Sequence, residues 1–202
     1  MDDGQGLSLR EVAAALGVLP PSCGPVRLVA VDGHAGSGKT TLAGRLAAEL
    51  GGAPVVHTDD LATHEEPFGW EGRFAAQVAG PFRAGRAARH EVYDWTARRF
   101  AYSREVPAAP VVLVEGVGAG RRTLRPHLAL TLWLEVDRDT ARGRGIRRDG
   151  PALAHFWTGW SAAEDAHFAS DPTRPYADLL VRQTQDGYRA VPGSGRGPAE
   201  TA

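Results

Sequence analysis

The stretch Gly33-His34-Ala35-Gly36-Ser37-Gly38-Lys39-Thr40 decides the fold of this chain, because it fits the phosphate-binding pattern G-x-x-x-x-G-K-[ST] at every defined position. An apolar, β-branched run precedes it at residues 26–31 and is typical of a buried parallel strand. After it, leucines recur at helical spacing over residues 42–50, until the glycine pair 51–52 stops the helix. The order of strand, glycine loop and helix predicts a phosphate-binding loop. The alternative is a glycine-rich turn that only caps a helix.

The chemistry of this loop follows from its residue types. Glycine adopts backbone angles that other residues avoid and has no Cβ, so successive amides can surround an anion at the positive end of the helix. Lys39, the only lysine of the chain, is predicted to reach the β- and γ-phosphates of a nucleotide, and the Thr40 hydroxyl to ligate Mg²⁺. The candidate nucleotide-binding residues here are Gly33, His34, Ala35, Gly36, Ser37, Gly38, Lys39, Thr40 and Thr41.

Length and composition limit the class of protein. The 202 residues suffice for one α/β domain, expected at 1–191, with an N-terminal helix and linker over 1–24 and a flexible tail over 192–202. A formal net charge of −1 gives no general attraction to nucleic acid or to a membrane surface. The single cysteine, Cys23, excludes an internal disulfide, and no run of 18 apolar residues occurs. We therefore expect a soluble, cytoplasmic protein.

The remaining elements are read from periodicity. We expect a short helix at 7–17 and further strands at 53–57, 111–116, 128–136 and 177–181. Segment 61–104 lacks a clean period and is rich in aromatic residues and arginine, so we expect one or two helices that form a wall over the sheet edge. In that wall Phe68 and Trp70 are candidates to contact a planar acceptor, although aromatic residues are more often core. For the aromatic residues of 152–168 we expect core packing.

Carboxylates follow two of the expected strands, at the edge where open α/β sheets bind ligands. After the strand at 53–57 we assign Asp59 as the base that accepts a hydroxyl proton and as a possible metal ligand, and Asp60 as a residue that orients the acceptor or helps to hold the metal. The alternative for both is an Asx-type helix cap. Glu115 ends the strand at 111–116 and is a candidate Mg²⁺ ligand, with an ordinary surface glutamate as the alternative.

Arginines gather on a helix that we expect to begin at Asp137. Arg144, Arg147 and Arg148 share one face of it, a spacing suited to a lid over about 138–150 that brings positive charge onto transferring phosphates. We assign Arg144 to nucleotide binding and the other two to catalysis. A solvated helix face is the alternative.

With these residues in place, the chain from Val26 to Val181 resembles the uridine kinase-like branch of the P-loop kinases. The resemblance rests on the glycine loop with its flanks (Val31–Leu42), Thr58-Asp59-Asp60, Tyr93-Asp94-Trp95, Val112–Gly116 and Ile146–Asp149. It implies a three-layer α/β fold whose five-stranded parallel sheet has the order 2-3-1-4-5. It also implies ATP and Mg²⁺, Asp59 as base, Thr40 and Glu115 as metal ligands, Tyr93 as an acceptor-wall residue and Arg148 as a lid arginine.

The chain departs from that family at two positions. Where uridine kinases usually place a base-contacting histidine, this chain has Arg98, and its lid passes from Arg148-Asp149 straight to Gly150-Pro151. An arginine facing the acceptor suits a carboxylate or a phosphate. The favoured function is phosphoryl transfer from ATP to a hydroxyl of a small molecule. The alternatives are a nucleoside monophosphate kinase and a regulatory nucleotide-binding module, and the protein is expected to be a monomer or a homodimer.

Overall fold

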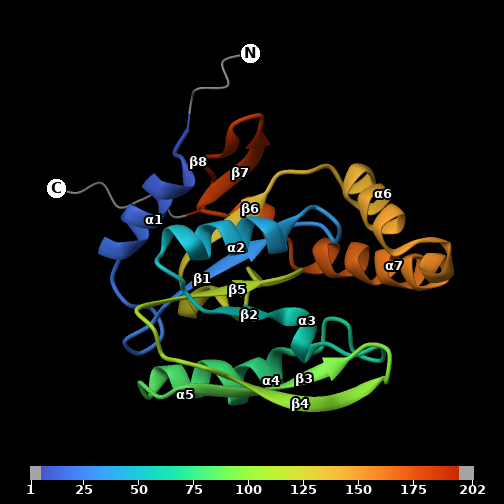
Figure 1. Cartoon of the computed structure of the whole chain (residues 1–202), viewed down its shortest axis with the longest axis horizontal. Helices are drawn as coiled ribbons and strands as arrows, with labels where there is room; N and C mark the ends of the chain where they lie inside the picture. The colour runs from blue at the N-terminus through green and yellow to red at the C-terminus, as the bar shows by residue number, and fades with distance from the viewer. Residues whose placement is uncertain (1–5, 196–202) are drawn as a thin grey trace.

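The centre of the molecule is a six-stranded sheet with the strand order β2-β5-β1-β6-β7-β8 (Figure 1). The structure is a computed structural model that describes residues 6–195. Five neighbouring strands run parallel, and β8 runs antiparallel to β7. The strands are β1 (Arg27–Asp32), β2 (Val55–His57), β5 (Val111–Glu115), β6 (Leu128–Leu134), β7 (Leu179–Thr184) and β8 (Gly187–Pro192). The predicted α/β class and parallel order are confirmed, and β8 is an additional strand that the sequence reading did not contain.

Two apolar clusters, one on each face of the sheet, make the three layers. Val29 and Val31 of β1 face a cluster that contains α1 (Leu9–Val18) and α2 (Lys39–Glu49). The alternate residues Leu28 and Ala30 face the opposite cluster, to which segment 61–88 contributes. This alternation is the two-residue period of a strand that is covered on both sides.

Segment 61–104 contains short helices, as expected, and also a hairpin that the sequence reading missed. The helical pieces from residue 58 on are α3 (Thr58–Leu61), α4 (Glu71–Phe74), a π-helical turn (Ala75–Ala79) and α5 (Gly80–Arg83). The hairpin consists of β3 (Ala88–Asp94) and β4 (Arg99–Val106), paired antiparallel. Ala88, His90 and Val92 are buried while Arg89 and Glu91 are exposed. The sequence analysis missed the two-residue period of β3 because one of these three buried positions, His90, is a polar residue.

The lid expected at about 138–150 falls on the first helix of a pair that lies beside the glycine loop, drawn in orange in Figure 1, and this pair is called the lid below. It comprises α6 (Arg138–Asp149), a 3₁₀ turn (Pro151–Leu153) and α7 (Ala154–Ser170), and two further 3₁₀ turns lie at Arg125–His127 and Arg174–Tyr176. Asp137 caps α6 by accepting a hydrogen bond from the Thr140 amide at 2.9 Å. Within residues 6–195, no helix is long and apolar enough to cross a bilayer.

The expected flexible tail, 192–202, lies only partly within the described residues. Pro192 ends β8, and the amides of Gly193 and Gly195 donate to the carbonyl oxygens of Asp178 and Ala177 at 2.8 and 2.9 Å. Residues 192–195 are therefore bonded to the body of the domain. The rest of the expected tail, 196–202, lies outside the described residues, as do residues 1–5 of the expected N-terminal segment.

Candidate active site

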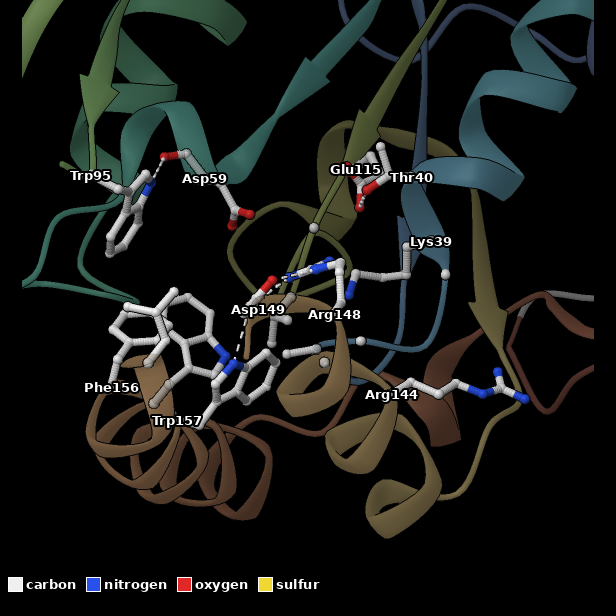
Figure 2. Close-up of a pocket in the computed structure, with 18 of the residues that line it drawn as sticks. Lys39, Thr40, Asp59, Trp95, Glu115, Arg144, Arg148, Asp149, Phe156 and Trp157 are labelled. Atoms are coloured by element: carbon white, nitrogen blue, oxygen red, sulfur yellow. Dashed lines mark hydrogen bonds and ion pairs between the residues drawn. The ribbon is translucent and has the colours of Figure 1, made fainter. Parts of the chain in front are cut away.

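A cavity of about 760 Å³ opens at the carboxyl ends of β1 and β5, between the glycine loop, α3, the hairpin and the α6–α7 pair (Figure 2). This is the edge at which open α/β sheets bind ligands. Of the residues that the sequence analysis assigned to the site, those that line this cavity are Ala35, Gly36, Gly38, Lys39, Thr40, Thr41, Asp59, Glu115, Arg144 and Arg148. Gly33, His34 and Ser37 belong to the same loop but do not line the cavity.

The glycine loop has the geometry of an anion cradle. Gly36 and Gly38 have φ values of +81° and +99°, in the left-handed region that favours glycine. Among residues 6–195 their amides donate to no acceptor, and the buried hydroxyl of Ser37 has no hydrogen-bond partner. A Cβ on Gly36 would collide with the carbonyl oxygen of Ala141 in α6. Free donors at the start of α2 therefore fit a phosphate group, and the missing side chain lets the lid helix lie against the loop.

Lys39 is held over this loop. It begins α2, it is 6% exposed, and its Nζ donates to the carbonyl oxygen of His34 at 3.0 Å. A phosphate oxygen is a better acceptor for an ammonium group than a neutral carbonyl oxygen, because both partners of the hydrogen bond are then charged. A phosphate oxygen in this loop would therefore compete with the His34 carbonyl oxygen for the Lys39 ammonium group.

Thr40 and Glu115 come together across the sheet edge. Thr40 Oγ1 donates to Glu115 Oε1 at 3.3 Å, and His57 Nδ1 lies 2.8 Å from Glu115 Oε2. The hydrogen bond to Glu115 raises the pKa of His57, and burial opposes that shift. Among residues 6–195, no three His, Cys, Asp or Glu side chains could hold a metal by themselves. Mg²⁺ usually takes one or two protein ligands beside phosphate and water, so Thr40 and Glu115 fit it as a partial set.

Asp59 faces the same cavity from α3 (Figure 2). Within the described residues its carboxylate accepts no hydrogen bond and forms no ion pair. The Asp59 side chain is exposed to the cavity. Desolvation by the surrounding protein atoms is the main cause that raises the pKa of its carboxyl group, and the negative charge of Glu115 raises it further. Lys39 and His57 oppose that shift. An unpartnered carboxylate with a raised pKa is suited to take a proton from an acceptor hydroxyl.

Two of the three arginines predicted for the lid line the cavity. Arg144 and Arg148 line it, whereas Arg147 is exposed and does not. Arg148 forms a two-pronged ion pair with Asp149, with Nε and Nη2 at 2.6 and 3.0 Å from the carboxylate oxygens. Trp157 Nε1 donates to the same carboxylate at 3.1 Å. Asp149 therefore links Arg148 of α6 to Trp157 of α7, within the lid itself.

Aromatic residues form one wall of the cavity, and the sequence analysis assigned none of them to the site. They are His64, Trp95, Phe156, Trp157 and Trp160, from the loop after α3, the hairpin and α7. The indole Nε1 of Trp95 donates to the carbonyl oxygen of Asp59 at 3.2 Å, which fixes this ring next to the candidate base. The helical period of 152–168 indicated an aromatic face. Periodicity cannot distinguish a face that covers a core from one that lines a cavity.

Two predicted acceptor-binding residues, Asp60 and Tyr93, do not line the cavity and instead support the hairpin. Asp60 Oδ2 accepts from Arg104 at 2.7 Å and lies 3.0 Å from His90 Nε2. The Tyr93 hydroxyl lies 3.0 Å from Nδ1 of His64, which does line the cavity. Tyr93 therefore contacts the cavity wall through His64, whereas Arg104 and His90, the partners of Asp60, are hairpin residues that do not line the cavity.

The other three predicted acceptor residues also lie outside the cavity lining. Arg98 is in the hairpin turn, mostly exposed, and its nearest acid is Glu65 at 3.5 Å. Phe68 stacks on His167 with 4.7 Å between ring centroids. Trp70 is 1% exposed and belongs to the core. The expectation that Arg98 faces the acceptor does not agree with this geometry, because the turn points the guanidinium toward solvent.

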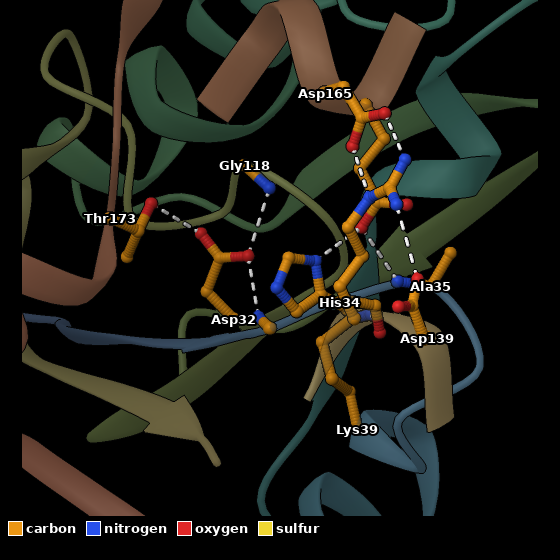
Figure 3. Close-up of polar contacts among 11 residues, drawn as sticks. Asp32, His34, Ala35, Lys39, Gly118, Asp139, Asp165 and Thr173 are labelled. Carbon is orange, nitrogen blue, oxygen red and sulfur yellow. Dashed lines mark hydrogen bonds and ion pairs between the residues drawn. The ribbon is translucent and has the colours of Figure 1, made fainter. Parts of the chain in front are cut away.

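A buried carboxylate that the sequence analysis did not assign organises the loop (Figure 3). Asp32 is fully buried at the end of β1, and its Oδ1 accepts from the amides of Gly33 and Gly118 at 2.7 and 3.0 Å. Its Oδ2 accepts from the Gly120 amide and the Thr173 hydroxyl at 2.9 and 2.7 Å. These four bonds hold together three segments that are distant in sequence. No local sequence signal could have shown them.

A second carboxylate joins the lid to the loop. Glu164 of α7 is 6% exposed and its Oε1 accepts from the Ala35 amide at 2.9 Å. The same oxygen lies 3.1 Å from His34 Nδ1. His34 thus contacts the lid rather than the cavity, and α7 is anchored at the entrance of the glycine loop.

Comparison with known proteins supports the same architecture. No family model matches the chain, and no curated protein matches its sequence. A possible uridine kinase from Bacillus stearothermophilus is 18% identical, with 85% of this chain and 96% of that chain covered at a TM-score of 0.61. A putative fructose transport system kinase from Silicibacter sp. TM1040 is 23% identical (81% and 89% covered, TM-score 0.51). D-glycerate 3-kinase from Cryptococcus neoformans is 12% identical (93% and 100% covered, TM-score 0.54). At these identities the likeness is one of fold: the chain shares the α/β fold of these solved kinase structures, which is the fold that the resemblance implied.

Proposed function

We propose that this protein is an ATP-dependent phosphotransferase that moves the γ-phosphoryl group of ATP to a hydroxyl of a small molecule. The observation that carries the proposal is the content of one cavity. Lys39, the free loop amides and the Thr40–Glu115 pair lie at one end of it, and the unpartnered carboxylate of Asp59 lies across from them. The fold shared with several kinases supports the same reading.

The residues have separable tasks in this reaction. The amides of Gly36 and Gly38, with Lys39, bind the β- and γ-phosphates. Thr40 and Glu115 would hold Mg²⁺, which supplies positive charge to the same phosphates. Asp59 accepts the hydroxyl proton as the bond between the acceptor oxygen and the γ-phosphorus forms and the bond to the β,γ-bridging oxygen breaks, so that ADP leaves.

The lid and the aromatic wall complete the site. Arg148 lines the same cavity as Lys39, and its guanidinium can stabilise negative charge on the transferring phosphoryl group once it leaves Asp149. The part of the cavity next to Asp59 is lined by Trp95, Phe156 and Trp160. These rings reduce the access of water, which would otherwise compete with the acceptor.

The proposal is tested by phosphate transfer itself. Purified protein is incubated with ATP, Mg²⁺ and pools of nucleosides, sugars, vitamins and amino alcohols, and new phosphate esters are identified by mass spectrometry and ³¹P NMR. We expect one acceptor class to be phosphorylated by the wild type and by Arg147→Ala, whose side chain is outside the cavity. Lys39→Ala should lose ATP binding, and Asp59→Asn should keep ATP binding while turnover falls by about 10²- to 10⁴-fold.

Two results would contradict the proposal. ATP bound tightly by the wild type with no ester formed from any pool would favour a regulatory nucleotide-binding module. If Asp59→Asn transfers the phosphoryl group at an undiminished rate, Asp59 is not the base. No observation favours a monophosphate kinase, because none of the arginines of 83–104, which motivated it, lines the cavity.

A further inference from the structure

The cavity is divided by charge into two sides. The Lys and Arg side chains that line it within the described chain are Lys39, Arg144 and Arg148, and they come from the start of α2 and from α6. In Figure 2, Arg148 and Lys39 lie together, whereas Trp95 and Phe156 lie on the side of Asp59. In that view the side chain of Arg144 points away from the other two, and Arg148, which also interacts electrostatically with Asp59, is held by Asp149.

The side of Asp59 presents ring faces from three separate parts of the chain. Trp95 of the hairpin lies 4.9 Å from His64, 6.0 Å from Phe156 and 5.9 Å from Trp160, measured between ring centroids. Phe156 and Trp160 are nearly parallel, 5.8 Å apart with 27° between their planes. Aromatic faces attract flat apolar groups by stacking and cations by their quadrupole, and they offer nothing to an anion.

The other cationic side chains near this side have partners. Arg98 points outward to Glu65 at 3.5 Å, and Arg104 is bound to Asp60 at 2.7 Å. His64 lines the cavity, and its Nδ1 lies 3.0 Å from the hydroxyl of Tyr93. An anionic acceptor beside Asp59 would therefore meet ring faces and an unpartnered carboxylate. Of the lysine and arginine side chains that interact electrostatically with Asp59, Arg148 is already paired with Asp149, and Lys39 is held at the glycine loop.

From this division of charge we infer that the acceptor is an alcohol with a flat, largely apolar body, that it carries no anionic group, and that any charge it bears is positive. The inference rests on the proposed function and narrows its substrate class. It excludes monophosphates and hydroxy acids as preferred acceptors. It also makes the ring wall, rather than a polar contact, the part of the site that selects the acceptor.

Three indole alcohols with one body and three charges test the inference: tryptophanol is a cation, tryptophol is neutral and indole-3-lactate is an anion. Each is titrated calorimetrically into the wild-type protein saturated with ADP and Mg²⁺, and each is tested for ATP-dependent ester formation. We expect tryptophanol to bind at least as tightly as tryptophol. Both should bind at least about tenfold more tightly than indole-3-lactate, because one charge contact of this kind changes affinity by about that factor.

Matched variants locate the effect. Trp95→Ala should weaken tryptophanol and tryptophol about tenfold and leave the affinity for ADP and Mg²⁺ unchanged, whereas Trp95→Phe should retain most of the binding. Tyr102→Ala serves as the control, because Tyr102 is 56% exposed on the same hairpin and does not line the cavity. Thr96 lines the cavity with an exposed side chain, so Thr96→Arg places a cation on this side and should raise the affinity for indole-3-lactate.

The outcomes separate this inference from the proposed function. If indole-3-lactate binds as tightly as the other two, or if none of the three binds at millimolar concentration, the inference is wrong even when ATP is bound and transferred to another acceptor. Equal losses for all three probes in Trp95→Ala would also overturn it, since the rings would then not distinguish charge. If the wild type does not bind ATP, the proposed function fails first.

Discussion

The carboxylate of Glu164 in α7 accepts a hydrogen bond from the main-chain amide of Ala35, 2.9 Å away, and so ties the lid to the start of the phosphate loop. Glu164 is nearly buried and also contacts His34. Because α7 is bonded to the glycine loop at Glu164, movement of the lid is restricted to the parts away from this residue. The arginines of α6 and the rings of α7 are thereby kept near the cavity in the absence of a nucleotide.

Removing this link should loosen the lid. We expect Glu164→Ala to lower the free energy of unfolding by about 1–3 kcal/mol, because the Ala35 amide loses its acceptor in a part-buried place. Urea denaturation of the variant measures the loss, with Thr158→Ala, exposed on the same helix, as the control. A loss no larger than that of the control would show that water replaces the carboxylate at little cost.

Asp32 should be the most sensitive carboxylate of the loop region. Asp32→Asn replaces one of the two accepting oxygens by a donor, which then faces N–H and O–H groups. We expect a loss of about 2–4 kcal/mol in the free energy of unfolding and weaker nucleotide binding, because the loop loses its support. Denaturation and ADP titration measure the two effects. Asp186→Asn, exposed in the turn after β7, is the control, and an equal change in both variants would refute the prediction.

The Arg148–Asp149 pair should compete with the nucleotide for the guanidinium. Arg148 is mostly exposed, so the ion pair contributes about 0.2–1 kcal/mol, and Asp149→Asn should therefore tighten the binding of a non-hydrolysable ATP analogue about two- to fivefold. Asparagine can still accept the hydrogen bond from Trp157. The gain should disappear when Arg148→Gln is added. Weaker binding by the single variant would mean that Asp149 positions Arg148 instead of restraining it.

Gly36 and Gly38 should respond differently to alanine, although both have positive φ. A Cβ at Gly38 meets no atom within 4 Å, whereas a Cβ at Gly36 collides with the backbone of Ala141. Both variants carry the strain of a left-handed residue, roughly 1–2 kcal/mol. We expect Gly36→Ala to lose about 1–3 kcal/mol more than Gly38→Ala, because the lid helix must shift. Equal unfolding free energies of the two variants would show that α6 adapts freely.

His167 should make the protein less stable in acid. Burial, followed by the positive charge of Arg121, lowers the pKa of His167, while Asp32, Asp171 and Glu71 oppose the shift. The folded pKa then lies below the unfolded value of about 6.5, so the unfolded chain binds more protons and stability falls as pH drops from about 7 through that value. His167→Phe keeps a ring stacked on Phe68 and should flatten this slope. His155→Gln, exposed on α7, should leave the slope unchanged, and the same slope in both variants would contradict the prediction.

The sequence by itself predicted the fold class and the phosphate-loop residues that line the candidate site. Gly36, Gly38, Lys39 and Thr40 are adjacent in the chain, so a local pattern of residue types shows their chemistry. Asp59 and Glu115 could also be identified from the sequence, because residues at the carboxyl end of a parallel strand lie at the sheet edge where ligands bind. The order of the five parallel strands came with the resemblance to one family.

Only the tertiary structure decided the acceptor side. Trp95 and Phe156 are 61 positions apart, and whether an aromatic residue fills a core or lines a cavity depends on what packs against it rather than on its own period. The same holds for Arg98, which the sequence placed at the acceptor and the hairpin turn directs to solvent, and for Asp32 and Glu164, whose partners come from distant segments. Local patterns fix local geometry, and contacts between distant segments exist only once the chain has folded.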